Sequence, residues 1–81
     1  MSFENSPFAI VMFEGSKYEV VATNWLRCHG EKVFCFWPPE HFANIKIVKM
    51  CSKRVPIGAD WSQHLVIIKK LKGKFFILYY F

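Results

Sequence analysis

One stretch near the start of the chain constrains the fold most: residues 8–22, FAIVMFEGSKYEVVA, predict two strands joined by a tight turn. Residues 8–13 and 18–22 are rich in β-branched and aromatic side chains, which suit a pleated surface. Gly15 tolerates a positive φ, and Ser16 can bond its own backbone. Two such runs separated by three to five residues that include Gly indicate a β-hairpin. The upstream run is apolar on both faces, so we expect it to be a central strand, whereas Glu19 can reach solvent.

The next segment predicts a third strand beside this hairpin. Trp25 and Leu26 are expected to pack back on the sheet, with Trp25 closing the far end of the hairpin. Residues 27–32 are polar and include Gly, so we expect a loop there. Residues 33–37, VFCFW, are apolar on both faces, as in a central strand. Pro38-Pro39 ends this strand, because Pro lacks the backbone donor of a sheet ladder.

Residues 39–51 are compatible with a helix or a strand. Pro39 and Glu40 suit the first turn of a helix, and the basic residues that follow suit its last turn. The inward stripe of such a helix would be Asn44, Ile47, Val48 and Cys51. As a strand, Ile45-Lys46-Ile47 alternates, and a bulge would restore the phase. The end signals favour the short helix.

The last third of the chain predicts the remaining strands. We expect a fourth strand over 64–68, a basic turn over 69–74 and a fifth strand over 75–81, an uninterrupted apolar run. Such a run also fits an aggregating segment, so residues 73–81 either fill a sheet slot or lie outside the native domain. The fold class is therefore α+β, with an antiparallel sheet of four or five strands and one short helix in a single domain over 1–81. A small SH3-like β-barrel is the alternative.

Composition makes a core possible in so short a chain. The 81 residues are 53% hydrophobic and 19% aromatic, so no metal or disulfide is required. Three cysteines are an odd number and do not suit a disulfide framework. The first residues lack the pattern of a signal peptide, and no run reaches the roughly 18 apolar residues of a membrane span. We therefore expect an intracellular, reducing location.

Three tryptophans set in a recurring pattern carry a resemblance to a known family. The matching stretches are Phe8–Phe13, Glu19–Val21, Trp25-Leu26, Cys35–Pro39, Pro56, Asp60-Trp61 and Val66–Ile68. Over residues 8–70 the chain is similar to a small N-terminal domain of uncharacterised invertebrate proteins. That domain often precedes a domain of unknown function and is sometimes linked to transposable elements. The resemblance implies a nuclear or chromatin-side setting and carries no assigned activity. The tail from residue 73 departs from the pattern.

The positive charge is concentrated in the second part of the chain. Residues 1–45 hold three basic and five acidic residues, whereas residues 46–81 hold eight basic residues and one acidic residue. Gathered on one surface, the basic side chains would suit the phosphate backbone of DNA or RNA. They would equally serve as a solvated face that keeps an apolar domain soluble. The candidate binding residues are Lys46, Lys49, Lys53, Arg54, Lys69, Lys70 and Lys72.

The tryptophans are the other candidate binding residues. Trp25, Trp37 and Trp61, with Tyr18 and either Glu19 or Asp60, could form a cage for a methylated lysine through cation–π attraction. The alternative is that they fill the ends of the sheet, which is the more common use in a domain of this size.

Catalytic and metal-binding patterns are weak. The Cys and His residues supply enough ligand atoms for zinc, but their spacing lacks the paired knuckles of a zinc site. Cys28 and His29 are neighbours, and neighbours on a strand point apart. Paired carboxylates and phosphate-binding glycine loops are absent from the sequence. We therefore expect no enzyme activity, no catalytic residues and no cofactor.

These patterns predict a non-catalytic protein-interaction module. Its partner is another protein or a second copy, bound through a sheet edge or an aromatic groove. The alternative is a nucleic-acid-binding module that uses the basic residues 46–74.

Overall fold

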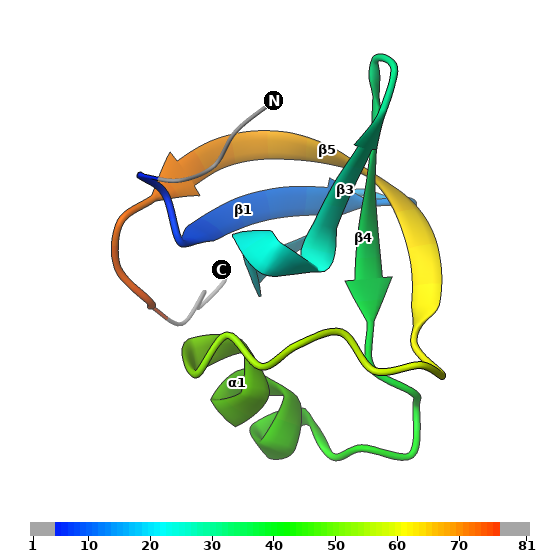
Figure 1. The fold of residues 1–81 in the computed structure, drawn as a ribbon, viewed down its shortest axis with the longest axis vertical. Coiled ribbons are helices and arrows are strands. Elements are labelled where there is room, and N and C mark those ends of the chain that lie inside the picture. Colours follow the sequence, from blue (N-terminus) through cyan, green and yellow to red (C-terminus); the bar gives the residue numbers. More distant parts are fainter. Residues whose placement is uncertain (1–4, 77–81) are drawn as a thin grey trace.

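The computed structural model describes residues 5–76 and leaves residues 1–4 and 77–81 outside. The described chain folds as α+β, with a five-stranded antiparallel sheet and one short α-helix (Figure 1). The elements are β1 (Phe8–Phe13), β2 (Lys17–Ala22), the 3₁₀ turn η1 (Thr23–Trp25), β3 (Leu26–His29), β4 (Lys32–Trp37), α1 (Asn44–Ser52) and β5 (Ser62–Lys72). The strand order is β2-β1-β5-β4-β3, and the sheet is not closed into a barrel. The predicted fold class is confirmed, and the barrel alternative is not adopted.

The predicted first hairpin forms as expected. Strands β1 and β2 pair from Phe8 opposite Ala22 to Phe13 opposite Lys17. The connecting turn places Gly15 at φ 84°, a left-handed conformation that Gly adopts without steric cost. β1 is a central strand, because β2 flanks it on one side and β5 on the other.

Strand β5 joins the two halves of the sheet. Its first part pairs with β4, from Trp37 opposite Ser62 to Val33 opposite Val66. Its second part pairs with β1, and the register shifts where Val11 faces Ile68. The prediction that the 33–37 strand lies beside the first hairpin is therefore wrong, because β5 lies between them.

The predicted limits of β5 are also wrong. The strand extends well beyond residues 64–68 and includes three of the four lysines that were expected to form a turn, while Lys74 lies after it. Lys70 lies opposite Ile10 and Lys72 opposite Phe8, while Lys69 is the extra residue at the register shift. Lysine is disfavoured in strands, but its long stem can cover apolar surface while its ammonium group stays in water. A bulge of this kind also increases the local bend of a strand.

A second hairpin, β3–β4, replaces the polar loop predicted over residues 27–32. Leu26 pairs with Cys35 and His29 with Lys32, and Gly30 makes the turn at φ 63°. β3 was missed because its outward residues are polar or charged and it is only four residues long. In Figure 1 this hairpin crosses β1 and the second part of β5 at a steep angle, while β4 pairs with the first part of β5, so the sheet is strongly curved.

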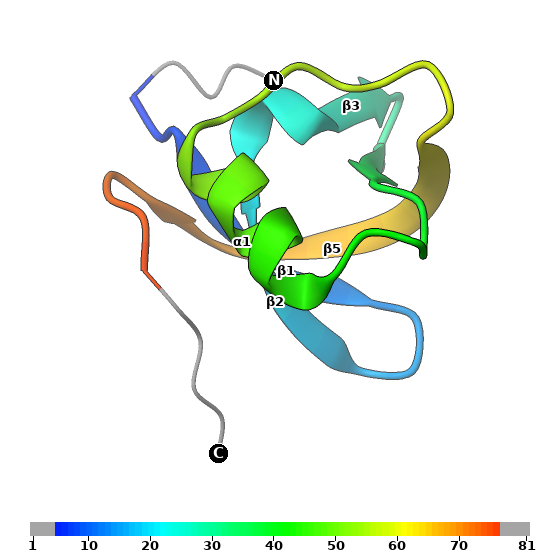
Figure 2. The same cartoon turned by 90° about the horizontal axis from the view of Figure 1, so that it is seen from below.

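The segment after the two prolines forms a helix, as predicted, but it begins later. Residue Pro39 is in a turn, closed by the Phe42 N–H donating to its carbonyl at 3.1 Å. Helix α1 starts at Asn44, and it buries Ile47 and Cys51 of the predicted inward stripe. Figure 2 shows the helix lying in front of the sheet. The Cys51 thiol lies 3.5 Å from the Val20 carbonyl on β2, which ties the helix to this edge of the sheet.

The helix ends in a Schellman motif that has arginine where glycine is usual. The Val55 N–H donates to the Met50 carbonyl, and the Arg54 N–H donates to the Cys51 carbonyl. Arg54 has φ 51°, in the left-handed region that favours Gly at this position. A side chain with a Cβ costs energy in that conformation, so its presence here needs a reason other than backbone geometry.

The expected strand over 75–81 falls partly on residues that the structure describes. Phe75 and Phe76 are not in a strand. The Phe75 ring packs edge-on against Phe8, with centroids 5.5 Å apart. Residues 77–81 lie outside the described residues.

Candidate functional site

The three tryptophans come together, but mostly in the core. Trp25 has no exposed surface, and it meets Trp61 and Trp37 edge-on at centroid distances of 5.0 and 6.0 Å. Its indole N–H donates to the Val55 carbonyl at 2.8 Å. Trp61 is also buried, whereas Trp37 is only partly buried. Trp25 and Trp61 therefore fill the core, and Trp37 is the one of the three that extends from the core to a surface cavity.

That cavity has a volume of about 430 Å³ and opens beside Trp37. This size lies within the range of small-ligand sites in proteins. The first hairpin supplies one side of the cavity, and the adjoining ends of β4 and β5 supply the other. The lining residues are Phe13, Glu14, Lys17, Glu19, Trp37, Gln63, His64 and Leu65.

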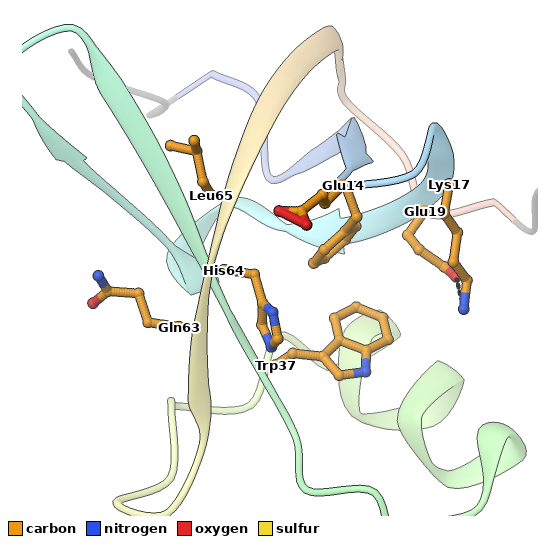
Figure 3. A pocket seen from close by; sticks show the side chains of 8 residues that line it. Glu14, Lys17, Glu19, Trp37, Gln63, His64 and Leu65 are labelled. Atoms are coloured by element: carbon orange, nitrogen blue, oxygen red, sulfur yellow. Dashed lines mark ion pairs between the residues drawn. The ribbon is translucent and has the colours of Figure 1, made fainter.

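Three rings form a corner in the cavity. Phe13 lies at the end of β1, and its ring centroid is 5.4 Å from that of Trp37, with the planes 76° apart. Phe13 also meets His64 at 5.9 Å and 65°. Figure 3 shows Trp37 and His64 side by side facing this space, while Gln63 and Leu65 point away. We call Phe13, Trp37 and His64 the aromatic corner.

The sheet register explains why these rings meet. Alternate residues of a strand share a face, so Phe13 lies on the same face as Val11, which is fully buried. His64 lies directly opposite Cys35, and Trp37 follows two residues later on that same face. β5 is the neighbour of both β1 and β4, and it therefore brings the corner residues together.

Two carboxylates lie beside the aromatic corner. Glu14 belongs to the turn of the first hairpin, and Glu19 to β2; both line the cavity. The Glu19 carboxylate is 3.6 Å from the Lys17 ammonium, with the side chains 31% and 72% exposed, respectively. Such an exposed pair contributes little, about 0–1 kcal/mol, so Lys17 can give up Glu19 at small cost. The corner thus combines ring faces with negative charge, which is the arrangement that attracts a cation.

His64 is held by a hydrogen bond of its own. Its Nε2 atom lies 2.7 Å from the Ser62 hydroxyl, two residues earlier on the same face of β5. This contact fixes the ring orientation and occupies one of the two ring nitrogens. The imidazole therefore presents its ring to the corner while one of its polar atoms is already satisfied.

A second cavity of about 280 Å³ adjoins the first. The two cavities share Lys17, Glu19 and Trp37, so these residues form the wall between them. The remaining lining is mainly apolar and comes from β2, helix α1 and the segment after β5: Val20, Asn44, Ile47, Val48, Cys51, Phe75 and Phe76.

The predicted basic residues fall into two groups. One lies on α1 and the residues after it: Lys46, Lys49, Lys53 and Arg54. The other lies at the end of β5: Lys69, Lys70 and Lys72.

Register brings parts of the two groups to the same end of the sheet. The Arg54 guanidinium lies 3.3 Å from the Thr23 hydroxyl. Thr23 follows Ala22 on β2, and Ala22 pairs with Phe8 on β1. Phe8 pairs on its other side with Lys72 on β5. The backbones at Ala22 and Lys72 are therefore two strand spacings apart, which is about 10 Å. Lys46 is apart from this end, and its ammonium lies over the Phe42 ring at 4.9 Å.

Cysteine and histidine residues do not gather into a ligand set in the part of the chain that the structure describes. Residues 5–76 contain no group of three or more Cys, His, Asp or Glu side chains placed to hold a metal ion. Burial raises the pKa of the Cys35 thiol well above its usual range and raises the pKa of Cys51 to about 12. Cys28 alone among the cysteines is exposed. Within residues 5–76, no helix is long and apolar enough to cross a bilayer.

Sequence reasoning found Trp37 and Glu19 but missed Phe13 and His64. Phe13 was assigned to an ordinary strand, and His64 to the start of another. Only the pairing of β5 with both β1 and β4 places the two side chains together. The sequence signal that could have indicated a binding residue here is an aromatic or charged side chain at the last position of a strand, next to a turn.

Known proteins add no further assignment. The chain matches no family model, no curated protein and no solved structure. The resemblance to the invertebrate N-terminal domain therefore stays a prediction.

Proposed function

We propose that this domain is a non-catalytic protein-interaction module that binds a cationic side chain of a partner protein at the aromatic corner. The observation that supports this proposal is the meeting of Phe13, Trp37 and His64 beside the Glu14 and Glu19 carboxylates. A cation over an aromatic face gains about 0.5–2 kcal/mol, depending on how far it is desolvated. The rest of the partner would supply further contacts along the surface.

The charge of the cavity lining favours a basic partner at the aromatic corner. The chain has a net charge of +5, so its overall charge does not attract a basic peptide, and any attraction must be local. The first hairpin supplies two carboxylates to the cavity against the single ammonium of Lys17. A basic side chain is thus steered toward this cavity by the local field.

Isosteric variants test the proposal without disturbing the core. A titration with a lysine-rich peptide, followed by amide NMR shifts of the labelled domain, should move the signals of Trp37 and His64. The double variant Glu14→Gln/Glu19→Gln should weaken binding about five-fold or more, since it removes both carboxylates. Lys17→Gln should strengthen binding, because it frees Glu19 from its present ion pair.

A matched control uses an acidic residue elsewhere. Glu31 lies in the exposed turn of the β3–β4 hairpin, and Glu31→Gln should leave the affinity unchanged. Equal losses for Glu31→Gln and for the double variant would show a diffuse charge effect and contradict the proposal. So would shifts that spare the aromatic corner.

Nucleic-acid binding is the second candidate, and one observation favours it. Arg54 occupies a left-handed position that glycine would fill at lower cost, and its guanidinium is directed to the end of the sheet that carries Lys72. A basic residue kept at such a position suggests a use for its charge. The partner in this case is a phosphate backbone, bound without sequence preference.

Fluorescence anisotropy with random-sequence DNA and RNA, at several salt concentrations, tests this candidate. Affinity should fall linearly with salt on logarithmic axes, and Arg54→Gln/Lys72→Gln should lower the slope by about 1 for each phosphate that the variant no longer neutralises. Lys32→Gln, in the other hairpin, serves as the control. No binding at low salt would exclude this candidate.

A further inference from the structure

The aromatic corner also has a chemical preference among cations. We infer that it takes a methylated ammonium group, as on a methylated lysine of the partner, in preference to an unmodified lysine. This inference rests on the proposed function, since it names the ligand of the same cavity. Of the three tryptophans in the cage expected from the sequence, only Trp37 belongs to this corner, because Trp25 and Trp61 are buried in the core.

Hydrogen bonding disfavours an unmodified lysine at the aromatic corner. An unmodified lysine ammonium has three N–H donors, and leaving them without acceptors on desolvation is costly. The faces of Phe13 and Trp37 offer no acceptor. The Glu19 carboxylate is shared with Lys17, and one nitrogen of His64 is bonded to Ser62. An ammonium that does not displace Lys17 is therefore left mainly with the Glu14 carboxylate as an acceptor for its three N–H donors. Methyl groups replace these N–H donors, so the methylated cation loses little on entering the corner.

The angles between the rings suit a methylated ammonium group. Phe13 stands at 76° to Trp37 and at 65° to His64, so the rings present walls in different directions. A tetrahedral methylated ammonium is bulky and apolar on every side, and it can touch more than one wall at once. Its positive charge is spread over the methyl groups, which lie against the ring faces. Tryptophan is the best ring partner for a cation, and it is Trp37 that reaches the cavity.

The two carboxylates attract a cation without having to contact it. Glu14 and Glu19 come from the turn and from the edge strand, and both are open to water. In Figure 3 Glu14 lies above the Trp37 and His64 rings, and Glu19 lies beyond Trp37 next to Lys17. A carboxylate beside the rings complements a diffuse cation without requiring a direct hydrogen bond. The corner therefore selects by ring contact, and the carboxylates add attraction common to all cations.

Three capped amino acids serve as probes: N-acetyl-lysine amide, its Nε-trimethyl form, and the neutral analogue in which carbon replaces the quaternary nitrogen. Amide and indole NMR shifts of the full chain are followed during each titration. We expect the trimethyl form to bind at least about three-fold more tightly than either of the others, with shifts centred on Trp37 and His64. The neutral analogue separates cation–π attraction from burial of apolar surface.

Each outcome decides between the inference and the proposed function. Equal or tighter binding of unmodified lysine at the corner would overturn the inference and leave the proposed function standing. Equal binding of the neutral analogue would overturn the inference, since charge would then play no part. Failure of lysine, its trimethyl form and lysine-rich peptide alike to bind at the corner would overturn both.

Two variants link the preference to the rings. Phe13→Leu keeps the apolar bulk and removes a ring face, so it should reduce the preference for the trimethyl form about two-fold or more. Trp37→Phe keeps a ring and should reduce the preference less. Phe34→Leu is the control: Phe34 is a partly buried phenylalanine on β4 that does not line the cavity. An unchanged preference in folded Phe13→Leu would contradict the assignment of the corner.

Discussion

The carbonyl of Val55 accepts two side-chain hydrogen bonds, so we expect the losses of stability on removing the two donors to be coupled. The Trp25 indole donates to it at 2.8 Å, and the Asn24 amide donates to it at 3.2 Å. Both donors lie in the η1 segment, and Val55 lies just after the helix. These bonds therefore tie the end of the first hairpin to the segment that leads to β5.

Each single substitution should lower the free energy of unfolding by a moderate amount. Trp25→Phe removes one donor but keeps a ring between the neighbouring tryptophans, so we expect a loss of about 2 kcal/mol. Asn24→Ala removes the other donor together with its bond to the Arg54 carbonyl, for a loss of about 1–2 kcal/mol. In each single variant the Val55 carbonyl keeps one partner.

The double variant should lose more than the sum of the two. With both donors gone, the Val55 carbonyl has no protein partner from this pair, and an unsatisfied buried acceptor costs about 1–3 kcal/mol. Because Val55 is only partly buried, we expect a coupling energy of about 1 kcal/mol.

Urea unfolding of the four proteins, followed by far-ultraviolet circular dichroism, measures this coupling. The total stability of a domain of this size is about 4–12 kcal/mol. If the double variant is unfolded in buffer, all four are measured with the same concentration of a stabilising osmolyte. Additive losses, equal to the sum within about 0.5 kcal/mol, would refute the reasoning and show that water replaces the missing donors.

Other predictions test the packing and the thiols. Iodoacetamide should modify only Cys28 in the folded protein, and mass spectrometry should find three adducts after denaturation. The raised pKa of Cys51 means that the folded state holds its proton more tightly than the unfolded state. The contribution of the Cys51 thiol to the free energy of unfolding is therefore complete below its ordinary pKa of 9.0 and is lost as the pH rises toward about 12. In urea unfolding, the free energy should fall by up to about 1.4 kcal/mol per pH unit over this range. Arg54→Gly should not destabilise the domain and should raise its stability by up to about 1 kcal/mol, since glycine adopts the left-handed position without strain; a loss would show that the guanidinium contact matters more. Gly58→Ala should cost about 1–3 kcal/mol in thermal unfolding, because the new Cβ would lie 2.5 Å from the Trp61 indole nitrogen; an unchanged Tm would show that the indole moves aside freely.

Local sequence determined the first hairpin and the class of the fold. Residues 8–22 carry both strand propensity and turn chemistry, and these act between neighbours in the chain. The register from Phe8 opposite Ala22 follows directly from the turn. Helix α1 was predicted from its end signals, of which the basic last turn is confirmed by Lys49, whereas Pro39 and Glu40 lie before the helix.

Strands that depend on distant partners were not predictable from local pattern. β3 has charged and polar outward residues, and the end of β5 is rich in lysine, so both resembled loops. Pairing with β4 and β1 supplies hydrogen bonds that outweigh the weak strand propensity of these residues. The order β2-β1-β5-β4-β3 is a property of contacts between residues far apart in the chain.

The candidate site was likewise predictable from the sequence only in part. The sequence by itself determined that the chain carries surplus aromatic residues and an acidic first hairpin next to a basic remainder, because composition and charge need no structure to be counted. Only the tertiary structure decided which aromatic residues are core and which reach the surface. Trp25 was placed at the centre because it packs against Trp37 and Trp61 at once, and Phe13 and His64 became neighbours because β5 pairs on both sides. Burial and proximity are set by the packing of distant segments, and no local pattern contains them.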